Sequence, residues 1–246
     1  MNPLMSTESV NHVNVSGPTR WAESIVDDYE GLEVSRHPFF VEASARPVDV
    51  GALWLLMANL ATGISRDFVV WLAQTIARVD DRRIASLLAK QLNDELGDGS
   101  FSRIHSGLLD RFIAGLEPYR PLRATSQSVL EPGRTLARKA SQLFASSSVY
   151  EAVGALMVGE IFAKKMDHCV GDQIRRQSAI SDDDLTWLII HETLEVEHAE
   201  DSREIAALVP RTPAVFEECQ RGARAQWLLL WGFLDDVHSV RVRYSS

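Results

Sequence analysis

Cysteine is scarce in this sequence. Only two of its 246 residues, Cys169 and Cys219, are cysteines. Two cysteines cannot make the disulfide framework of a small secreted domain, and they suit a reducing compartment. The first residues also lack the charged and apolar regions of a signal peptide, so we expect a cytoplasmic protein. The longest mostly apolar run, VGALWLLMANLATG, is too short to cross a bilayer, and no membrane partner is expected.

Basic residues are too few and too scattered to form a phosphate-binding surface. The chain carries 25 Lys and Arg against 34 Asp and Glu, which gives a formal net charge of −9. Nucleic acid requires clustered Lys and Arg, so we expect no nucleic-acid partner. The sequence also has no Gly-x-Ser-x-Gly, no phosphate-cradling glycine loop and no Cys-x-x-Cys, which excludes the mechanisms that these motifs serve.

Strand-type alternation is missing as well, whereas helical periodicity runs through nearly the whole chain. Residues 1–19 are polar and are predicted to form a disordered tail. No linker or change of composition interrupts 20–246, and 46% of the residues are hydrophobic, enough for a sizeable core. The sequence therefore predicts an all-α fold of seven to nine helices in a single domain over 20–246.

Proline, glycine and capping residues set the limits of these expected helices. They are about 21–32, 48–79 with a kink near Gly63, 81–95, a segment after the ELGDGS break that stops before Pro118, a connecting helix after Pro132-Gly133, 149–170 capped by the serines at 146–148, a helix opened by a Ser181–Asp184 capping box and running to about 208, and one from Pro213 to about 238.

The octapeptide HETLEVEH at 191–198 places metal-ligand types of side chain on an inward face. An α-helix turns about 100° per residue, so His191, Glu195 and His198 fall on a stripe about 60° wide. Trp187 and Leu188 extend the stripe, which indicates that it faces the core. Buried ionisable groups are costly unless paired or bound to metal, and di-metal helical bundles use this Glu-x-x-His spacing. A core histidine beside a salt-bridged glutamate fits the octapeptide equally well.

Three further candidates lie on other predicted helices. Glu95 and His105 flank the glycine-rich break at 97–99, which could let their side chains converge, although a helix end with a core histidine also explains them. Glu160 lies on an apolar stripe beside small residues, where an unpaired carboxylate is unfavourable. Carboxylates combined with imidazoles suit iron or manganese. The full candidate set is Glu95, His105, Glu160, His191, Glu195 and His198.

Other polar clusters are weaker candidates. Asp235 and His238 stand at i and i+3, and 167–169 reads Asp-His-Cys, but both groups lie near predicted helix ends, where mixed polar clusters are usual. His37 precedes a proline in a turn and is expected to be structural. Glu192 borders the inward stripe and could support a ligand.

The segments NDELGDGSFSRIH, EAVGALMVGE and HETLEVEH, in this order and spacing, resemble the heme-oxygenase-like diiron oxidases and oxygenases. That family is related to heme oxygenase, to thiaminase-like proteins and to pyrroloquinoline quinone synthase, and the likeness extends from RHPFF at 36–40 to the last helix. It implies a compact seven-helix heme-oxygenase-like bundle in which the six candidates bind two Fe(II) ions, with manganese in one site as a variant. Glu195 departs from the pattern, because the family often has Asp there, and the longer side chain could change how it bridges or chelates.

The resemblance implies a non-heme diiron oxidase or oxygenase with O2 as co-substrate and an external electron donor. The expected substrate is a small amino-acid- or amine-derived molecule, and the outcomes are N-oxygenation, desaturation or oxidative C–C cleavage in specialised-metabolite (natural product) biosynthesis. Trp54, Trp71 and Phe101 are candidates for the substrate pocket.

Two alternatives stay open. One is a metal-independent enzyme of the same fold, like the thiaminase-like and quinone-synthase relatives. The other is a non-catalytic helical binding protein. A homodimer formed through the long helices is also expected, although no exposed heptad seam is visible.

Overall fold

The computed structural model describes residues 21–44, 48–121, 127–146, 148–176 and 180–245, and within them it contains helices and no strands. The prediction of an all-α fold is confirmed for this part of the chain. The α-helices are α1 Ala22–Glu30, α2 Pro38–Ala43, α3 Val50–Leu60, α4 Phe68–Arg78, α5 Arg82–Glu95, α6 His105–Leu116, α7 Glu131–Ser146, α8 Val149–Ile174, α9 Thr186–Leu208 and α10 Pro213–Ser245. There are more of them than the seven that the resemblance implies, because short α1 and α2 precede the bundle and a π-helical segment separates α3 from α4. The predicted tail over 1–19 lies outside the described residues.

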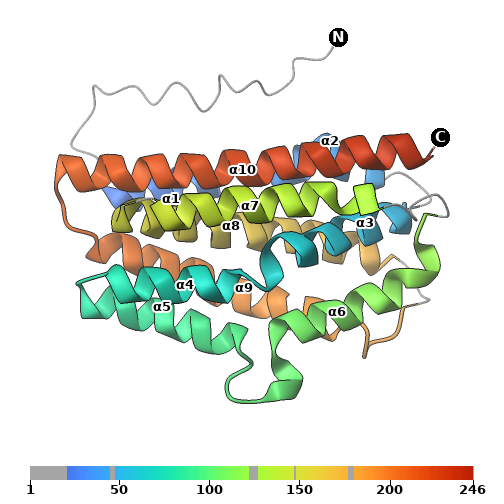
Figure 1. Ribbon diagram of the computed structural model, residues 1–246, viewed down its shortest axis with the longest axis horizontal. Coiled ribbons are helices and arrows are strands. Elements are labelled where there is room, and N and C mark those ends of the chain that lie inside the picture. The colour runs from blue at the N-terminus through green and yellow to red at the C-terminus, as the bar shows by residue number, and fades with distance from the viewer. Residues whose placement is uncertain (1–20, 45–47, 122–126, 147, 177–179, 246) are drawn as a thin grey trace, which may run out of the picture.

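Helix α8 is the centre of the bundle. Long α10 runs along one side of it, and α9 packs against it on another, while α4, α5 and α6 lie on the far side of the molecule from α10 (Figure 1). Ser148 caps α8 as predicted, because its Oγ accepts a hydrogen bond from the Glu151 N–H and the Glu151 carboxylate accepts one from the Ser148 N–H. Most residues of α8 from 152 to 174 are buried, as expected of a helix surrounded by others.

Two glycines allow α8 and α10 to cross at close range. A Cβ atom at Gly154 would collide with the backbone of Cys219, and one at Gly222 would collide with the backbone of Glu151. The two backbones therefore touch where any side chain would hold them apart.

The helix break expected near Gly63 is present as a π-helical segment over Ala61–Ser65. Asn59 supports it from the core: its side-chain amide donates to the carbonyls of Leu55 and Val129, and its Oδ1 accepts from the Gly133 N–H. The chain bends at this segment, between α3 and α4 (Figure 1).

Taken together, α3, the π-helical segment and α4 form one helical segment, Val50–Arg78. By its length and composition alone this segment could cross a membrane. This helical segment is longer than the apolar run VGALWLLMANLATG, because the π-helical turn joins α3 to α4. Half of its most apolar window is buried inside the protein, which is the pattern of a core helix.

Three helix limits differ from the predictions. The Ser181–Asp184 pair forms its hydrogen bonds, but α9 begins only at Thr186, so the pair closes the preceding turn. Helix α8 continues to Ile174, and α10 starts at Pro213 as predicted but continues to Ser245. The buried apolar residues form one cluster, and the single-domain assignment stays a prediction.

Candidate metal centre

Glu95 and His105 converge because the chain reverses between α5 and α6. Gly97, Asp98 and Gly99 all have positive φ, at 82°, 53° and 77°, which turns the backbone sharply after the last residue of α5. His105 is the first residue of α6. As a result, Glu95 Oε1 lies 3.2 Å from His105 Nδ1, and the convergence expected from the sequence is present.

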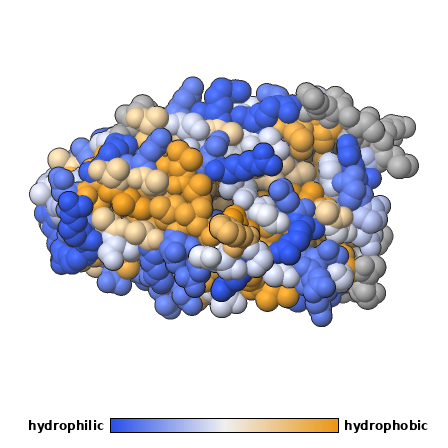
Figure 2. Space-filling model, turned by 60° about the horizontal axis from the view of Figure 1, so that its bottom comes forward, coloured by the Kyte–Doolittle hydropathy of each residue, from blue (hydrophilic) through white to orange (hydrophobic). Residues whose placement is uncertain are grey.

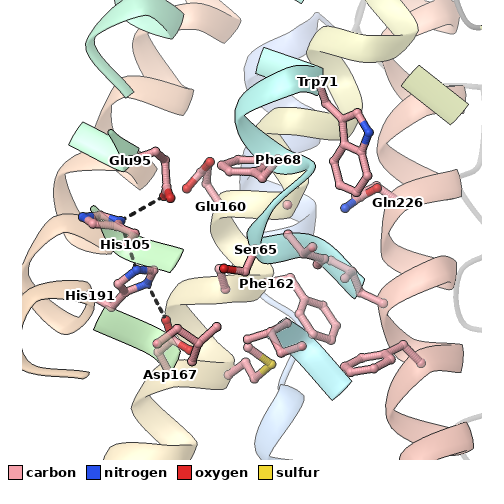
Figure 3. Close-up of a pocket in the computed structure, with 18 of the residues that line it drawn as sticks. Ser65, Phe68, Trp71, Glu95, His105, Glu160, Phe162, Asp167, His191 and Gln226 are labelled. Carbon is pink, nitrogen blue, oxygen red and sulfur yellow. Dashed lines mark hydrogen bonds and ion pairs between the residues drawn. The ribbon is translucent and has the colours of Figure 1, made fainter. Parts of the chain in front are cut away.

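His191 of α9 completes a group of three with them. Its Nε2 lies 3.2 Å from Nδ1 of His105, and one ligand atom from each of Glu95, His105 and His191 lies within 4.8 Å of the others. Figure 3 shows the three side chains pointing toward one another at one end of a pocket. Two imidazole nitrogens and a carboxylate aimed at one point are a suitable donor set for a metal ion.

His198 and Glu160 form a second group next to the first. His198 Nδ1 lies 3.3 Å from Glu160 Oε2, and its Nε2 lies 3.3 Å from Asp94 Oδ2. Glu160 is 3% exposed, and its Oε1 is buried without a hydrogen-bond partner among the described residues. A carboxylate oxygen in that situation is costly, and a cation would satisfy it.

The side chain of Glu195 lies outside the described part of the structure, so only its place on α9, between His191 and His198, is known. The other five predicted ligands are distributed over α5, α6, α8 and α9. Burial raises the pKa of Glu95, but the hydrogen bond from His105 and the nearby His191 and His198 outweigh it, and the net pKa is lowered. That carboxyl is held in its ionised, ligand-competent form.

Asp167 is a site residue that the sequence reasoning placed wrongly. It lies inside α8 rather than at a helix end, it is 1% exposed, and its Oδ2 lies 3.2 Å from Nδ1 of His191. His168 beside it is exposed, and burial raises the pKa of the Cys169 thiol to about 11, so the Asp-His-Cys triplet does not act as a unit. Asp167 follows Glu160 by seven residues, which puts both on the same stripe of a helix; this spacing was the available signal.

Asp167 orients His191. When Nδ1 of His191 donates to Asp167, its Nε2 keeps a lone pair directed toward Glu95 and His105, the arrangement of carboxylate–histidine–metal triads. Burial raises the pKa of Asp167, and the hydrogen bond with His191 opposes that shift. The second carboxylate oxygen, Oδ1, is buried without a hydrogen-bond partner among the described residues.

The remaining polar candidates take no part in these groups. Glu192 binds the Arg175 guanidinium at 2.8 Å. Asp235 accepts from His37, which is buried and caps α2 through its Nδ1. His238 lies 3.7 Å from Glu42. Asp94, beside His198, was not anticipated, and nothing in its local sequence distinguishes it from a surface acid.

A cavity of about 100 Å³ adjoins the first group of three. Its other lining residues are mostly apolar and come from α3, the π-helical segment, α4, α6, α8, α9 and α10. Trp71 lines it as expected, but Trp54 does not, because its indole N–H donates to Glu117. Phe101 is 92% exposed, in the loop between α5 and α6. Figure 2 shows hydrophobic side chains gathered in patches among hydrophilic ones on the face that comes forward when the bottom of Figure 1 is turned toward the viewer.

The donor set fits iron. Buried carboxylates and imidazoles without a thiolate are ligands that iron and manganese accept in helical bundles. The two neighbouring groups also contain buried oxygens, Glu160 Oε1 and Asp167 Oδ1, that have no hydrogen-bond partner among the described residues and that a cation would satisfy.

Known proteins resemble the chain at the level of both family and fold. Residues 59–231 match the family described as iron-containing redox enzymes, whereas no curated protein matches the chain. A TenA homologue from Pseudomonas syringae pv. tomato has a TM-score of 0.68 at 15% identity, covering 97% of this chain and 98% of that one. A CADD-like protein of unknown function from Nostoc punctiforme has a TM-score of 0.64 at 17% identity, covering 95% and 96%.

A third similar structure is a domain of unknown function from Shewanella denitrificans with a heme oxygenase-like fold, at a TM-score of 0.65, 17% identity and 92% of each chain. These likenesses show that the bundle has the heme oxygenase-like fold. Since the family match spans well over half of the chain and includes all six predicted ligand positions, this protein belongs to the family of iron-containing redox enzymes.

Proposed function

We propose that this protein is a non-heme diiron oxidase or oxygenase that uses O2 to oxidise a small amine-derived substrate. The observation that carries the proposal is the buried meeting of Glu95, His105 and His191 beside the Glu160–His198 pair. In a family of iron-containing redox enzymes, such paired groups of carboxylates and imidazoles suit two ions.

The six residues Glu95, His105, Glu160, His191, Glu195 and His198 would hold two Fe(II) ions, or one iron and one manganese. When bound, iron supplies the activation of dioxygen. The chain's own residues fix the donor positions: the positive-φ loop holds Glu95 and His105 together, and Asp167 orients His191. The apolar side chains around the cavity exclude bulk water from the reacting substrate.

The polar lining of the cavity favours an amine over a free amino acid. Its ionisable side chains are Glu95, Glu160, Asp167, His105 and His191, and no Lys or Arg lines it. A substrate carboxylate would find no basic side chain there, whereas Asp167 Oδ1 can accept a hydrogen bond from a substrate N–H. N-oxygenation, desaturation and oxidative C–C cleavage remain the proposed outcomes, within specialised metabolism.

Partners and location complete the proposal. An enzyme of this kind needs an external electron donor to return iron to the ferrous state, and we propose a cytoplasmic homodimer. Light scattering of the purified protein gives its mass in solution and tests the dimer directly.

Iron binding and reaction with oxygen test the proposal. Anaerobic protein loaded with ferrous iron should bind about two ions per chain, and mixing with O2 should produce a transient absorbance that a suitable amine accelerates. His191→Ala and His198→Ala should lose this iron, whereas His168→Ala, an exposed histidine on the same bundle, should keep it. Wild-type protein that binds no stoichiometric iron would overturn the proposal in favour of the metal-independent alternative.

A further inference from the structure

Gln226 is a buried polar residue at the end of the cavity away from the candidate metal ligands. It projects from α10, is 5% exposed, and lines the cavity. Its Oε1 is buried without a hydrogen-bond partner among the described residues. Figure 3 shows its amide beside Trp71, across the pocket from His105, His191 and Asp167.

Gly159 of α8 is a neighbour of the Gln226 side chain. A Cβ at Gly159 would make ordinary van der Waals contact with Gln226, at 3.6 Å from Nε2 and 3.9 Å from Cγ, so the side chain packs close to α8. A buried amide oxygen that makes no hydrogen bond destabilises the folded protein. Its retention at a cavity wall is explained if a ligand supplies the missing donor.

The surroundings of Gln226 limit what that ligand can be. The cavity lining is mostly apolar and includes Leu60, Ile64, Phe68, Leu230 and Phe233, with Ser65 as a further neutral polar group. No basic side chain lines the cavity, so no protein group beside Gln226 would pair with an anion. The protein side chains at both ends of the cavity present acceptor oxygens.

The volume sets the scale of the occupant. The cavity measures about 100 Å³, and an engineered cavity of roughly 150 Å³ binds benzene. A short aliphatic or small cyclic body fits such a space.

We propose that Gln226 determines substrate specificity: its Oε1 accepts a hydrogen bond from a neutral hydroxyl or amide N–H on the part of the substrate remote from the metal ligands. The substrate is accordingly a small, mainly apolar molecule that carries a distal donor and no free carboxylate. This inference rests on the proposed function for the identity of the site, but it concerns the opposite end of the cavity.

Binding of simple probes tests the proposal without turnover. The full chain is titrated, both as purified and after anaerobic loading with ferrous iron, with 1-pentanol, with butyl methyl ether and with pentanoate. These probes are similar in size, and they present respectively a donor, an acceptor without a donor, and an anion. Trp71 and Trp187 line the cavity, so tryptophan fluorescence reports occupancy. The variant is Gln226→Met, and the matched control is Gln173→Met, because Gln173 is also buried with an unpartnered Oε1 but lies outside this cavity.

In the wild type and in Gln173→Met, 1-pentanol should bind about 5-fold more tightly than the ether, the ratio expected for one neutral hydrogen bond, and pentanoate should bind most weakly. Gln226→Met should abolish the preference for the alcohol while the ether binds as before. An unchanged preference in Gln226→Met, pentanoate binding as tight as that of the alcohol, or no binding of any probe to the wild type would each overturn the proposal. Neither the protein as purified nor the iron-loaded protein needs oxygen in these titrations. The outcomes are therefore independent of whether iron supports oxidation.

Discussion

A buried carboxylate behind a histidine has a role different from that of a ligand. Asp167 touches His191 on the side facing away from Glu95 and His105. It fixes which imidazole nitrogen carries the proton and limits rotation of the ring. Its contribution to the candidate centre should therefore appear as metal affinity.

Asp167→Asn should weaken ferrous iron binding by about 10- to 100-fold, the usual effect of removing such a supporting carboxylate. The amide keeps the shape of the side chain but loses the charge that stabilises the oriented imidazole. Anaerobic competition with a chromogenic iron chelator measures the change. Asp172→Asn, an exposed acid on the same helix, should leave affinity unchanged; equal affinities for Asp167→Asn and the wild type would show that Asp167 does not orient His191.

The spacing of residues along one helix predicts well which of its side chains face the same side. Glu160 was found from its apolar stripe, and the same stripe contains Asp167 one heptad later, which was missed because α8 was expected to end near 170. Trp54 and Phe101 were misplaced for another reason. Whether an aromatic side chain enters a cavity depends on the packing of several helices and on the path of a loop, and local periodicity contains neither.

The loop between α5 and α6 is the element that determines whether Glu95 and His105 meet. Gly97 has φ of +82°, and a Cβ there would approach Ser100 O at 2.5 Å and Arg103 C at 2.7 Å. Gly99 has φ of +77°, but nothing lies within 4 Å of a Cβ at that position. The two glycines share a backbone conformation and differ in their surroundings.

Gly97→Ala should therefore displace the loop and remove most of the bound iron, whereas Gly99→Ala should retain iron and cost about 1–2 kcal/mol in free energy of unfolding from left-handed strain alone. Iron content after gel filtration and thermal unfolding measure the two effects separately. Full iron content in Gly97→Ala would mean that the loop tolerates the added methyl group and does not control the convergence.

The presence of each helix could be predicted better than the residues at which it begins and ends. The π-helical turn at Gly63, the Ser148 cap and the Pro213 start all follow from local chemistry. The Ser181–Asp184 pair satisfied the same local rule and still preceded the helix, since α9 begins only at Thr186. Helices α8 and α10 extend beyond their predicted ends because burial against neighbouring helices stabilises them where local signals weaken.

The stability of the whole molecule should depend on pH through His37, which joins α2 to α10. Its Nδ1 accepts from the Phe39 N–H and its Nε2 donates to Asp235, so the neutral ring is satisfied on both sides. Burial lowers the pKa of His37; Asp235 opposes that shift, and His238 adds to it. A second proton on the ring would break the contact with Phe39.

Because the folded pKa lies below that of the unfolded chain, near 6.5, His37 favours folding above that pH, and this contribution is lost as the pH falls below it. The free energy of unfolding should decrease from pH 7 to 5 by at most about 1.4 kcal/mol per pH unit from this one group. Chemical unfolding in the presence of a metal chelator measures it. His37→Asn, which can still cap α2, should show a flatter profile than the wild type or His168→Asn. Identical slopes for His37→Asn and the wild type would assign the acid sensitivity to another group.

The composition of the cavity could be predicted least. Gln226, Ser65 and Phe68 lie on three elements, and nothing in their local sequence relates them to one another or to His191. They meet only because Gly154 and Gly222 bring α10 close to α8 and because the helix bends at Gly63.

The distribution of these residues has a consequence for how the protein can change over time. The candidate metal ligands come from α5, α6, α8 and α9, whereas Gln226 and Leu230 come from α10 and the facing apolar wall comes from residues 60–68. Mutations at these cavity positions thus fall on helices other than those that carry the candidate metal ligands, whereas Phe162, Met166 and Trp187 line the cavity from α8 and α9. A lineage can acquire new substrates through changes in α10 while the candidate metal ligands stay constant, and a laboratory library restricted to Leu60, Ile64, Gln226 and Leu230 would sample the same changes.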